Sequence, residues 1–493
     1  MPDKSVETSG SLGLAAARGT AYGFLLRIIS FTLSQLTLRF VDPVALGRAS
    51  IRLELLLNTA LFLGREGFRL ALIRTDSESI IRSKSDEKVT TGQELEADLI
   101  SSNKHKTINN VSWLSIPVGV ILSFVALFAH MYSCNHMKKS TLNNSMTIFD
   151  DNSEQDYKIA GILYCVAAFV ESLAEPLVIK AMQQLDVESR AAADGSAALA
   201  KAMTSVLLLN GSNPAFIPAK LNFSSKWPVT AFGMAQLIHS FVLTYILYNR
   251  KWKSIEWPSF SLTFSIKQNF DITTLKLTIM FTLQGIFKHL LTEGDRIVLT
   301  ALADGYDQGV YAMASSYGGI ASRLLLQPLE ENARLLFAKQ EKIYKTQLHK
   351  KSSKDRKGTN ADHNENISQD SVNQIKTSEL ERTLCVILKL VLYIGLLFSC
   401  VATNYTNLLL TILAGNRWIN NSDASDALSA FCCYTALLSL NGTTEAFVYG
   451  VTKSGADVGR LGLAHFLGMY TFCYLITTGI SPPCISSKQF SII

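Results

Sequence analysis

The chain has 493 residues, of which 48% are hydrophobic and 17% are charged, and its mean hydropathy is +0.20. Soluble proteins carry about 25% charged residues, so this composition excludes a soluble Rossmann-type enzyme, a disordered scaffold and a secreted disulfide framework. The formal net charge of +6 is modest and comes from lysines in hydrophilic segments, so it does not indicate a nucleic-acid partner.

Apolar segments of about 18 or more residues recur along the chain, and each is long enough to cross roughly 30 Å of hydrocarbon as a helix. We therefore predict an all-α polytopic membrane protein with about eleven spans. In chain order these are residues 13–40, 44–73, 111–133, 157–180, 191–210, 229–248, 273–302, 309–339, 381–401, 424–451 and 461–480. The first span is too long for the apolar part of a signal peptide, so we expect it to serve as the targeting signal.

Two strongly hydrophilic segments, residues 74–110 and 340–380, lie between the predicted spans, and their polarity predicts mobile loops. A cytosolic N-terminus would place them, together with residues 181–190, 249–271 and 452–460, on the cytosolic side. These five segments carry about 20 lysines and arginines, against about five in the opposite loops. An excess of positive charge marks the cytosolic side, so the sequence predicts this orientation.

An internal duplication is visible in two polar signatures that recur at offsets of 265 and 270 residues. They are Glu66-x-x-Arg69 with Glu331-x-x-Arg334, and Glu171-x-x-x-Glu175 with Asn441-x-x-x-Glu445. Each pair has the same place and direction in a six-span half, which predicts two parallel repeats, residues 1–250 and 251–493, flanking a substrate path. The sequence after residue 480 is too short and too broken by proline for a twelfth span, so we expect a truncated gene model or splice form.

Many ionisable residues lie inside the predicted spans, where each costs about 2.5–3.5 kcal/mol against lipid, so we expect them to face one another or water. Helical spacing places several on shared faces. The second span groups Glu54, Arg65 and Arg69; the seventh groups Gln284, Lys288 and Asp295, with Glu293 and Arg296 adjoining; the eighth aligns Arg323, Gln327, Glu330 and Arg334; the first and fourth add Arg27, Arg39, Glu171 and Glu175. We expect these spans to meet across one water-filled, net cationic cavity.

This pattern is typical of a site for an anionic headgroup, because guanidinium groups match diphosphate oxygens and stay charged in a low dielectric. The predicted ligands are Arg27, Arg39, Arg65, Arg69, Lys288, Arg296, Arg323 and Arg334. The predicted gating partners, pairing with these cations when the site is empty, are Glu54, Glu66, Glu171, Glu175, Glu293, Asp295, Glu330, Glu331, Asn441 and Glu445. The alternative is that these groups form fixed ion pairs that hold the bundle together.

Two smaller pairs have their own interpretations. Glu171 and Glu175, one helical turn apart, either carry protons or form a structural hydrogen-bonded pair. Lys201 and Asp194, seven residues apart on one helix face, are predicted to pair with each other. No hydrolytic motif, phosphate-binding loop or metal-ligand spacing occurs, and the eight cysteines include no C-x-x-C. We therefore expect no enzyme activity, no metal and no cofactor.

Five segments resemble the Rft family: residues 26–72, 112–119 (SWLSIPVG), 291–298 (LTEGDRIV), 308–339 and 438–450 (LSLNGTTEAFVYG). This family is related to MurJ lipid flippases and MATE exporters. The resemblance implies a MATE/MurJ-like two-lobe bundle that translocates dolichol-pyrophosphate-linked oligosaccharide across the endoplasmic reticulum membrane for protein N-glycosylation. It puts Arg27, Arg39, Arg65 and Arg69 first as headgroup contacts. The family's TEG[ED]R pattern falls on residues 292–296 and its QP[IL]EE pattern on residues 327–331.

Two alternatives stay open beside translocation by alternating access. The first is a non-transporting accessory protein that binds the same lipid and presents it to glycosyltransferases or to another flippase. The second is a cation-coupled exporter of the MATE type that uses Glu171 and Glu175.

Overall fold

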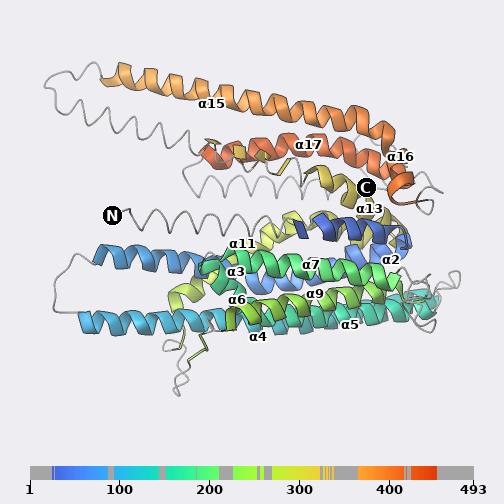
Figure 1. Ribbon diagram of the computed structural model, residues 1–493, viewed down its shortest axis with the longest axis horizontal. Helices are drawn as coiled ribbons and strands as arrows, with labels where there is room; N and C mark the ends of the chain where they lie inside the picture. The colour runs from blue at the N-terminus through green and yellow to red at the C-terminus, as the bar shows by residue number, and fades with distance from the viewer. Residues whose placement is uncertain are drawn as a thin grey trace. The chain divides into compact units, whose positions relative to one another are not determined.

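In the computed structural model, the described residues form helices joined by turns (Figure 1). The structure describes residues 25–26, 28–86, 94–143, 151–184, 186–209, 226–252, 256–259, 269–322, 326–327, 329–330, 332–333, 336–337, 365–415, 418 and 423–451. The chain divides into two compact units, Met1–Gly309 and Val310–Ile493. Each unit is described by itself.

Unit 1 is a helical bundle organised around α3 (Glu54–Asp86), which packs against α4, α5, α6 and α11. A helix at Ile28–Leu38 precedes it. The remaining helices are α2 (Pro43–Gly47), η1 (Arg48–Leu53), α4 (Glu94–Asn143), α5 (Asp151–Leu173), α6 (Glu175–Gln183), α7 (Val187–Leu209), α9 (Pro228–Lys251), α11 (Ile272–Thr292) and α12 (Gly294–Leu302). Small side chains, Ala174 between α5 and α6 and Ala193 and Ala197 of α7, pack with Leu243 and Leu247 of α9 in one apolar core.

Unit 2 contains most of α13 (Gly305–Ala321), followed by α15 (Glu365–Leu396), η4 (Leu397–Val401), η5 (Ala402–Tyr405), α16 (Thr406–Leu413) and α17 (Asp423–Val451). Helices α15 and α17 pack against each other. The chain leaves α16 through Gly415, whose φ of 80° favours glycine. The predicted eleventh span, residues 461–480, lies outside the described residues.

Four helical segments in the described part of the chain are long and apolar enough to cross a membrane: Lys106–Asn135, Glu188–Leu209, Pro228–Lys251 and Leu380–Leu413. A fifth is added if the bent pair α5 and α6 is counted as one span. The prediction of an all-α protein with several membrane-spanning helices is confirmed. Helix α3 is less apolar than these four because it carries Glu54, Arg65, Glu66 and Arg69.

The expectation that the two hydrophilic segments are loops is wrong over much of their length. Helix α3 continues to Asp86, α4 already begins at Glu94, and α15 begins at Glu365. Low hydropathy excludes burial in lipid but not helix formation, because a helix satisfies its own backbone hydrogen bonds and these segments contain good helix formers. The helices therefore continue well past the apolar part of each predicted span.

Two predicted spans are broken, and each break places a carboxylate at the start of a new helix. Helices α5 and α6 meet at a bend of 43°, with Pro176 in the first turn of α6. Proline cannot donate the backbone hydrogen bond that a continuous helix requires there. Tyr248 of α9 donates to the carbonyl of Leu173 beside this bend, at 3.2 Å. Helices α11 and α12 are separated at Glu293, so Glu175 and Glu293 both lie at helix N-termini, where the helix dipole favours negative charge.

Helices α3 and α11 approach closely at Gly67. A Cβ atom at Gly67 would lie 2.7 Å from the carbonyl oxygen of Thr278 and 2.9 Å from the amide of Thr282. Backbone atoms cannot move aside as a flexible side chain can, so only glycine fits here. This contact brings the charged residues on either side of Gly67 to within reach of α11.

We expect Gly67→Ala to lower the thermal stability of the protein. Overpacking costs about 1–3 kcal/mol, which outweighs a helix-propensity gain of about 1 kcal/mol. Melting followed by size-exclusion chromatography would measure the loss. Gly285→Ala is the matched control on the facing helix, because its Cβ would meet side-chain atoms, the Phe62 ring at 3.3 Å and Glu66 Cγ at 3.9 Å, and no backbone atom within this distance. Equal melting temperatures for the two variants would contradict the close approach.

Candidate functional site

Helix α3 forms ion pairs with four other helices of unit 1. Both acidic and basic side chains of α3 take part, each with a partner of opposite charge on another helix. The pairs are Glu54 with Lys201 of α7, Arg65 with Glu171 of α5, Glu66 with Lys288 of α11, and Arg69 with Glu175 of α6. The contacts of α3 thus involve three of the predicted ligands, Arg65, Arg69 and Lys288, and four of the predicted gating residues, Glu54, Glu66, Glu171 and Glu175.

Arg69 and Glu175 form a bidentate pair. Arg69 Nε donates to Glu175 Oε1 at 2.5 Å, and Nη2 donates to Oε2 at 2.8 Å. The arginine side chain is 15% exposed and the glutamate 5%. Two short parallel hydrogen bonds in a buried position fix the guanidinium in one orientation. The Nε and Nη2 donors of Arg69 are therefore already engaged by the Glu175 carboxylate.

Arg65 is held much more loosely than Arg69, although it lies only one helical turn away. Its Nη1 atom is 3.7 Å from Glu171 Oε2, which is too long for a hydrogen bond. The Arg65 side chain is 32% exposed, against 6% for Glu171. The guanidinium therefore keeps donor groups that an anion could reach.

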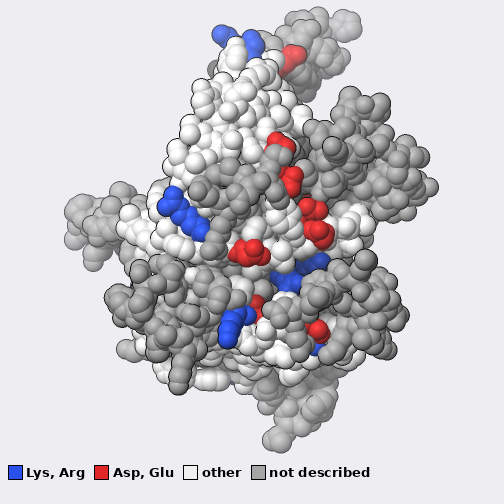
Figure 2. Space-filling model, turned by 90° about the vertical axis from the view of Figure 1, so that its right-hand side faces the viewer, with Lys and Arg blue, Asp and Glu red and all other residues white. Residues whose placement is uncertain are grey.

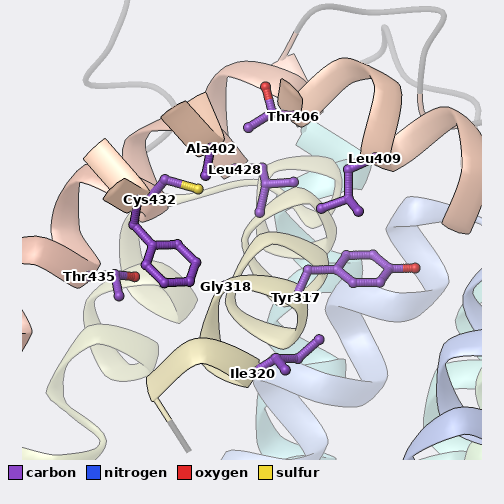
Figure 3. A pocket seen from close by; sticks show the side chains of 10 residues that line it. Tyr317, Gly318, Ile320, Ala402, Thr406, Leu409, Leu428, Cys432 and Thr435 are labelled. Carbon is purple, nitrogen blue, oxygen red and sulfur yellow. The ribbon is translucent and has the colours of Figure 1, made fainter. Parts of the chain in front are cut away.

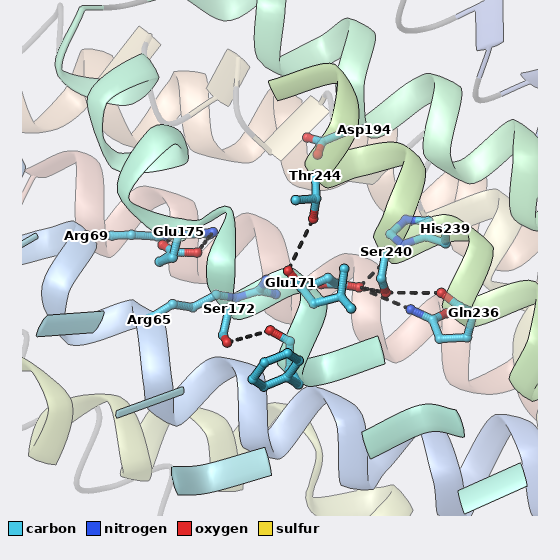
Figure 4. Close-up of polar contacts among 12 residues, drawn as sticks. Arg65, Arg69, Glu171, Ser172, Glu175, Asp194, Gln236, His239, Ser240 and Thr244 are labelled. Atoms are coloured by element: carbon cyan, nitrogen blue, oxygen red, sulfur yellow. Dashed lines mark hydrogen bonds and ion pairs between the residues drawn. The ribbon is translucent and has the colours of Figure 1, made fainter. Parts of the chain in front are cut away.

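The second oxygen of Glu171 faces helix α9 (Figure 4). Oε1 accepts hydrogen bonds from Ser240 Oγ at 2.9 Å and from Gln236 Nε2 at 3.2 Å. His239 Nδ1 lies 3.4 Å from the same oxygen. Gln236 and Ser240 are buried, so their polar groups need hydrogen-bond partners inside the protein. Ser240 Oγ also lies 3.1 Å from the backbone carbonyl oxygen of Gln236. We call Gln236, His239 and Ser240 the α9 cradle.

A second polar group lies where α11 ends and α12 begins. Lys288 Nζ is 3.2 Å from Glu66 Oε1, and the lysine side chain is 66% exposed. Arg296 Nη1 is 3.2 Å from Glu293 Oε2, whose other oxygen lies 3.4 Å from Asn58 Nδ2. This group thus contains one strongly exposed cation, Lys288, and one cation held by a carboxylate three residues away.

The remaining predicted residues are spread over both units. Arg39 and Asp295 are described and exposed, near the end of the first helix and in the first turn of α12. In unit 2, Asn441 and Glu445 lie on α17, and the carboxylate of Glu330 lies against Gly442 of the same helix. Arg27, Arg323, Glu331 and Arg334 lie outside the described residues.

The prediction that Lys201 pairs with Asp194 is wrong. Lys201 Nζ lies 2.9 Å from Glu54 Oε1 of α3, whereas Asp194 lies 3.9 Å from Arg190 Nε. Seven residues of helix separate the two Cα atoms by about 10 Å along the axis. The glutamate on the neighbouring helix is closer, so it binds the lysine.

Sequence reasoning missed the α9 cradle. A signal was available, because Gln236, His239 and Ser240 have the i, i+3, i+4 spacing that places residues on one helix face. In an apolar helix, such a polar face requires a polar partner on a neighbouring helix. Only the packing of α9 against α5 identifies that partner as Glu171.

Unit 2 contains an apolar groove of about 370 Å³ (Figure 3). It is lined by Tyr317, Gly318, Ile320, Phe398, Ala402, Thr406, Leu409, Leu428, Cys432 and Thr435. No charged side chain is among these lining residues, so the groove offers hydrocarbon contacts but no counter-charge for a phosphate. Among the residues that the structure describes, no group of three or more His, Cys, Asp or Glu is arranged to hold a metal ion.

Comparisons with known proteins agree on one family. The family described as Rft protein matches residues 21–482. Three relatives carry the name Man(5)GlcNAc(2)-PP-dolichol translocation protein RFT1. The one from Schizosaccharomyces pombe is 28% identical, over 89% of this chain and 72% of its own length. The one from Dictyostelium discoideum is 26% identical, over 87% and 73%, and the one from Mus musculus is 26% identical, over 96% and 78%.

A solved structure shares the fold. It is an inward-facing multidrug resistance MATE family transporter of the MOP superfamily. The match has a TM-score of 0.52 at 12% identity and covers 94% of this chain and 89% of that one. The likeness therefore concerns the helical fold.

Proposed function

Because the chain belongs to the Rft protein family, we propose that it translocates Man(5)GlcNAc(2)-PP-dolichol, the lipid named in its relatives, across a membrane. Transfer would run from the cytosolic to the luminal leaflet of the endoplasmic reticulum, in support of N-glycosylation. It would proceed by alternating access, with no covalent chemistry. The observation that carries this proposal is the loosely held, partly exposed Arg65 side chain inside a membrane-spanning bundle.

A partly exposed arginine in such a bundle needs a polar environment. Its cost against lipid is about 2.5–3.5 kcal/mol even on the lenient insertion scale. One third of the Arg65 side chain is exposed, and its only carboxylate contact in the described residues is long. We propose that this exposed side borders water or the bound headgroup. Arg65 would then donate to the diphosphate, while Arg69 stays paired with Glu175.

Lys288 is the second cation that we assign to the headgroup. Its side chain is the more exposed member of the pair with Glu66, at 66% against 21%. Arg296 is 28% exposed and contacts Glu293. We propose that Arg296 supports the break between α11 and α12 and that Lys288 contacts the lipid's phosphate or sugar groups.

We also propose that the two halves are parallel repeats. Adding the sequence offsets of 265 and 270 residues to Arg65 and Glu171 gives Glu330 and Asn441. Arg65 pairs with Glu171 in unit 1, and the Glu330 carboxylate lies against Gly442, next to Asn441, in unit 2. The position of Glu330 beside the helix that carries Asn441 resembles the position of Arg65 beside Glu171, and this similarity supports the repeat.

The cytosolic membrane boundary is proposed to lie at the end of the bundle that carries three tryptophans. Trp113 stacks on Trp257 with ring centroids 5.3 Å apart, and Trp252 and Trp257 are about 60% exposed. Tryptophan is enriched at membrane–water interfaces.

A charged loop lies beside these tryptophans. Burial alone would raise the pKa of the Asp186 carboxyl, but hydrogen bonds from Lys251 and Ser189 lower this pKa below its ordinary value, so the Asp186 carboxylate is ionised. Figure 2 shows the opposite end, with acidic and basic side chains among uncharged ones.

Thiol labelling in sealed microsomes would test this orientation. Glu188, at the start of α7, is exposed at the proposed cytosolic end, and Asp304, before α13, is exposed at the other end. In a background without native cysteines, Glu188→Cys should react with a membrane-impermeant maleimide in sealed microsomes. Asp304→Cys should react only after permeabilisation. The reverse pattern would overturn the assignment.

The central test is transport by purified protein in liposomes. Labelled Man(5)GlcNAc(2)-PP-dolichol should move between leaflets faster than in empty liposomes. Binding without faster movement would favour the accessory role, in which the protein presents the lipid to glycosyltransferases or to another flippase. Transport that follows an imposed proton or sodium gradient would favour the exporter. We rank the exporter last because Glu171 and Glu175 already have arginine partners.

A further inference from the structure

We propose that Glu171 is an internal counter-ion that gives up Arg65 to the diphosphate, and that the α9 cradle stabilises the carboxylate while Arg65 is engaged elsewhere. This inference rests on the proposed function and adds positioning roles for residues of α5 and α9. Glu171, Gln236, His239 and Ser240 would not touch the lipid. They would set how readily Arg65 can turn toward it.

The two oxygens of the Glu171 carboxylate have different partners. Oε2 faces Arg65 across 3.7 Å, whereas Oε1 accepts hydrogen bonds from Ser240 and Gln236. Figure 4 shows the carboxylate between the arginine from α3 and the polar side chains from α9. The tighter contacts are those with α9. The arginine can therefore leave without stripping the carboxylate of its hydrogen bonds.

The neighbouring pair shows what a fixed arginine requires. Both oxygens of Glu175 accept from Arg69, at 2.5 and 2.8 Å. Removing Arg69 would leave a carboxylate that is 5% exposed without a cationic partner. A buried charge left alone is strongly destabilising. Arg69 must therefore stay with Glu175 for the protein to remain stable, whereas Arg65 can move away from Glu171.

The α9 cradle also contains a possible hydrogen-bond donor to Glu171, the Nδ1 atom of His239. His239 Nδ1 is buried and makes no hydrogen bond within the described part of the protein, although it lies 3.4 Å from Glu171 Oε1. A small movement would let this nitrogen, when it carries a proton, donate to the carboxylate. The histidine can thus replace part of the electrostatic stabilisation that Arg65 provides in the empty protein.

Competition between Glu171 and a diphosphate for Arg65 predicts binding changes of opposite sign. Glu171→Gln removes the competing charge but keeps the side-chain shape, so an isoprenoid diphosphate should bind about fivefold more tightly, as expected for one partly solvated charge pair. Ser240→Ala weakens the support for the carboxylate when Arg65 leaves, so binding should weaken by about the same factor. In an Arg65→Ala background both changes should have no effect, because the competed group is absent.

The experiment measures binding of radiolabelled farnesyl diphosphate to the full chain in nanodiscs. Glu188→Gln is the charge-matched control, since Glu188 is exposed and its ion-pair partner is Arg250. Ser205→Ala is the matched serine control, because Ser205 is buried and bonds only the backbone of its own helix. Both controls should bind as the wild type does. If Glu171→Gln does not fold, the pair Ser240→Ala and Ser240→Thr carries the test, with threonine restoring the affinity that alanine loses.

The outcomes separate this inference from the proposed function. Opposite signs for Glu171→Gln and Ser240→Ala, abolished by Arg65→Ala, would support the competition. Weaker binding in both variants would mean that the cluster is only structural and would overturn the inference, as would unchanged binding in Glu171→Gln. No binding of farnesyl diphosphate by the wild type would remove the proposed headgroup site and the competition together.

Discussion

Replacing Arg65 by alanine is expected to abolish most translocation while leaving the protein folded. The variant loses a charge-assisted contact to the diphosphate worth about 1.5–3 kcal/mol, which corresponds to roughly tenfold to hundredfold in binding. Folding should survive because Glu171 keeps its hydrogen bonds from Ser240 and Gln236. The liposome assay measures the first effect, and glycosylation of a reporter glycoprotein in cells depleted of their own relative measures it in vivo.

The control for this prediction is the conservative change Arg65→Lys. It keeps the positive charge but loses the planar fork, so activity should be partly retained. The melting temperature of both variants should stay within about 2 °C of the wild type, since the lost pair is long and partly exposed. An Arg65→Ala protein that unfolds or is not produced would favour the alternative in which these residues only hold the bundle together.

Replacing Arg69 by alanine is expected to have the opposite profile, a large loss of stability. The change leaves Glu175 buried without its bidentate partner, and removing one member of a buried pair costs about 3–5 kcal/mol. Little folded protein should be recovered after size-exclusion chromatography, and its melting temperature should fall. Any loss of glycosylation in cells would then follow the loss of protein.

A double replacement distinguishes pairing from headgroup binding. Arg69→Met combined with Glu175→Met removes both charges and keeps most of the volume, so much of the stability should return. The matched control is Arg250→Ala, which removes an arginine whose contact with Glu188 is 3.8 Å long and exposed on both sides, and which should change little. A stable Arg69→Ala protein that cannot bind farnesyl diphosphate would instead make Arg69 a ligand.

The two arginines show why a motif does not reveal the task of each residue in it. The REGFR sequence places Arg65 and Arg69 on one face of a helix, and both are equally strong candidates on spacing alone. The bend between α5 and α6 lies between the two glutamates with which these arginines pair. Glu175 begins α6 and reaches Arg69 with both oxygens, whereas Glu171 remains in α5 and directs one oxygen to α9.

The sequence by itself determined the helical membrane class and the concentration of charge on α3. These features depend on hydropathy and helical spacing, which are local properties of the chain. The break before Pro176, inside the span predicted at residues 157–180, came from the structure. The sequence could not distinguish a hydrophilic loop from a hydrophilic helix, because hydropathy measures preference for lipid and not backbone geometry. The helical lengths of α3, α4 and α15 therefore came only from the structure.

Tertiary structure alone decided which charges meet. Lys201 pairs with Glu54 across two helices, and Glu171 is shared between Arg65 and the α9 cradle. Such pairings depend on which helix packs beside which and on a few ångströms of side-chain reach. Coulomb energy and hydrogen bonding fall steeply over that distance, so spacing along one helix cannot choose among partners on its neighbours.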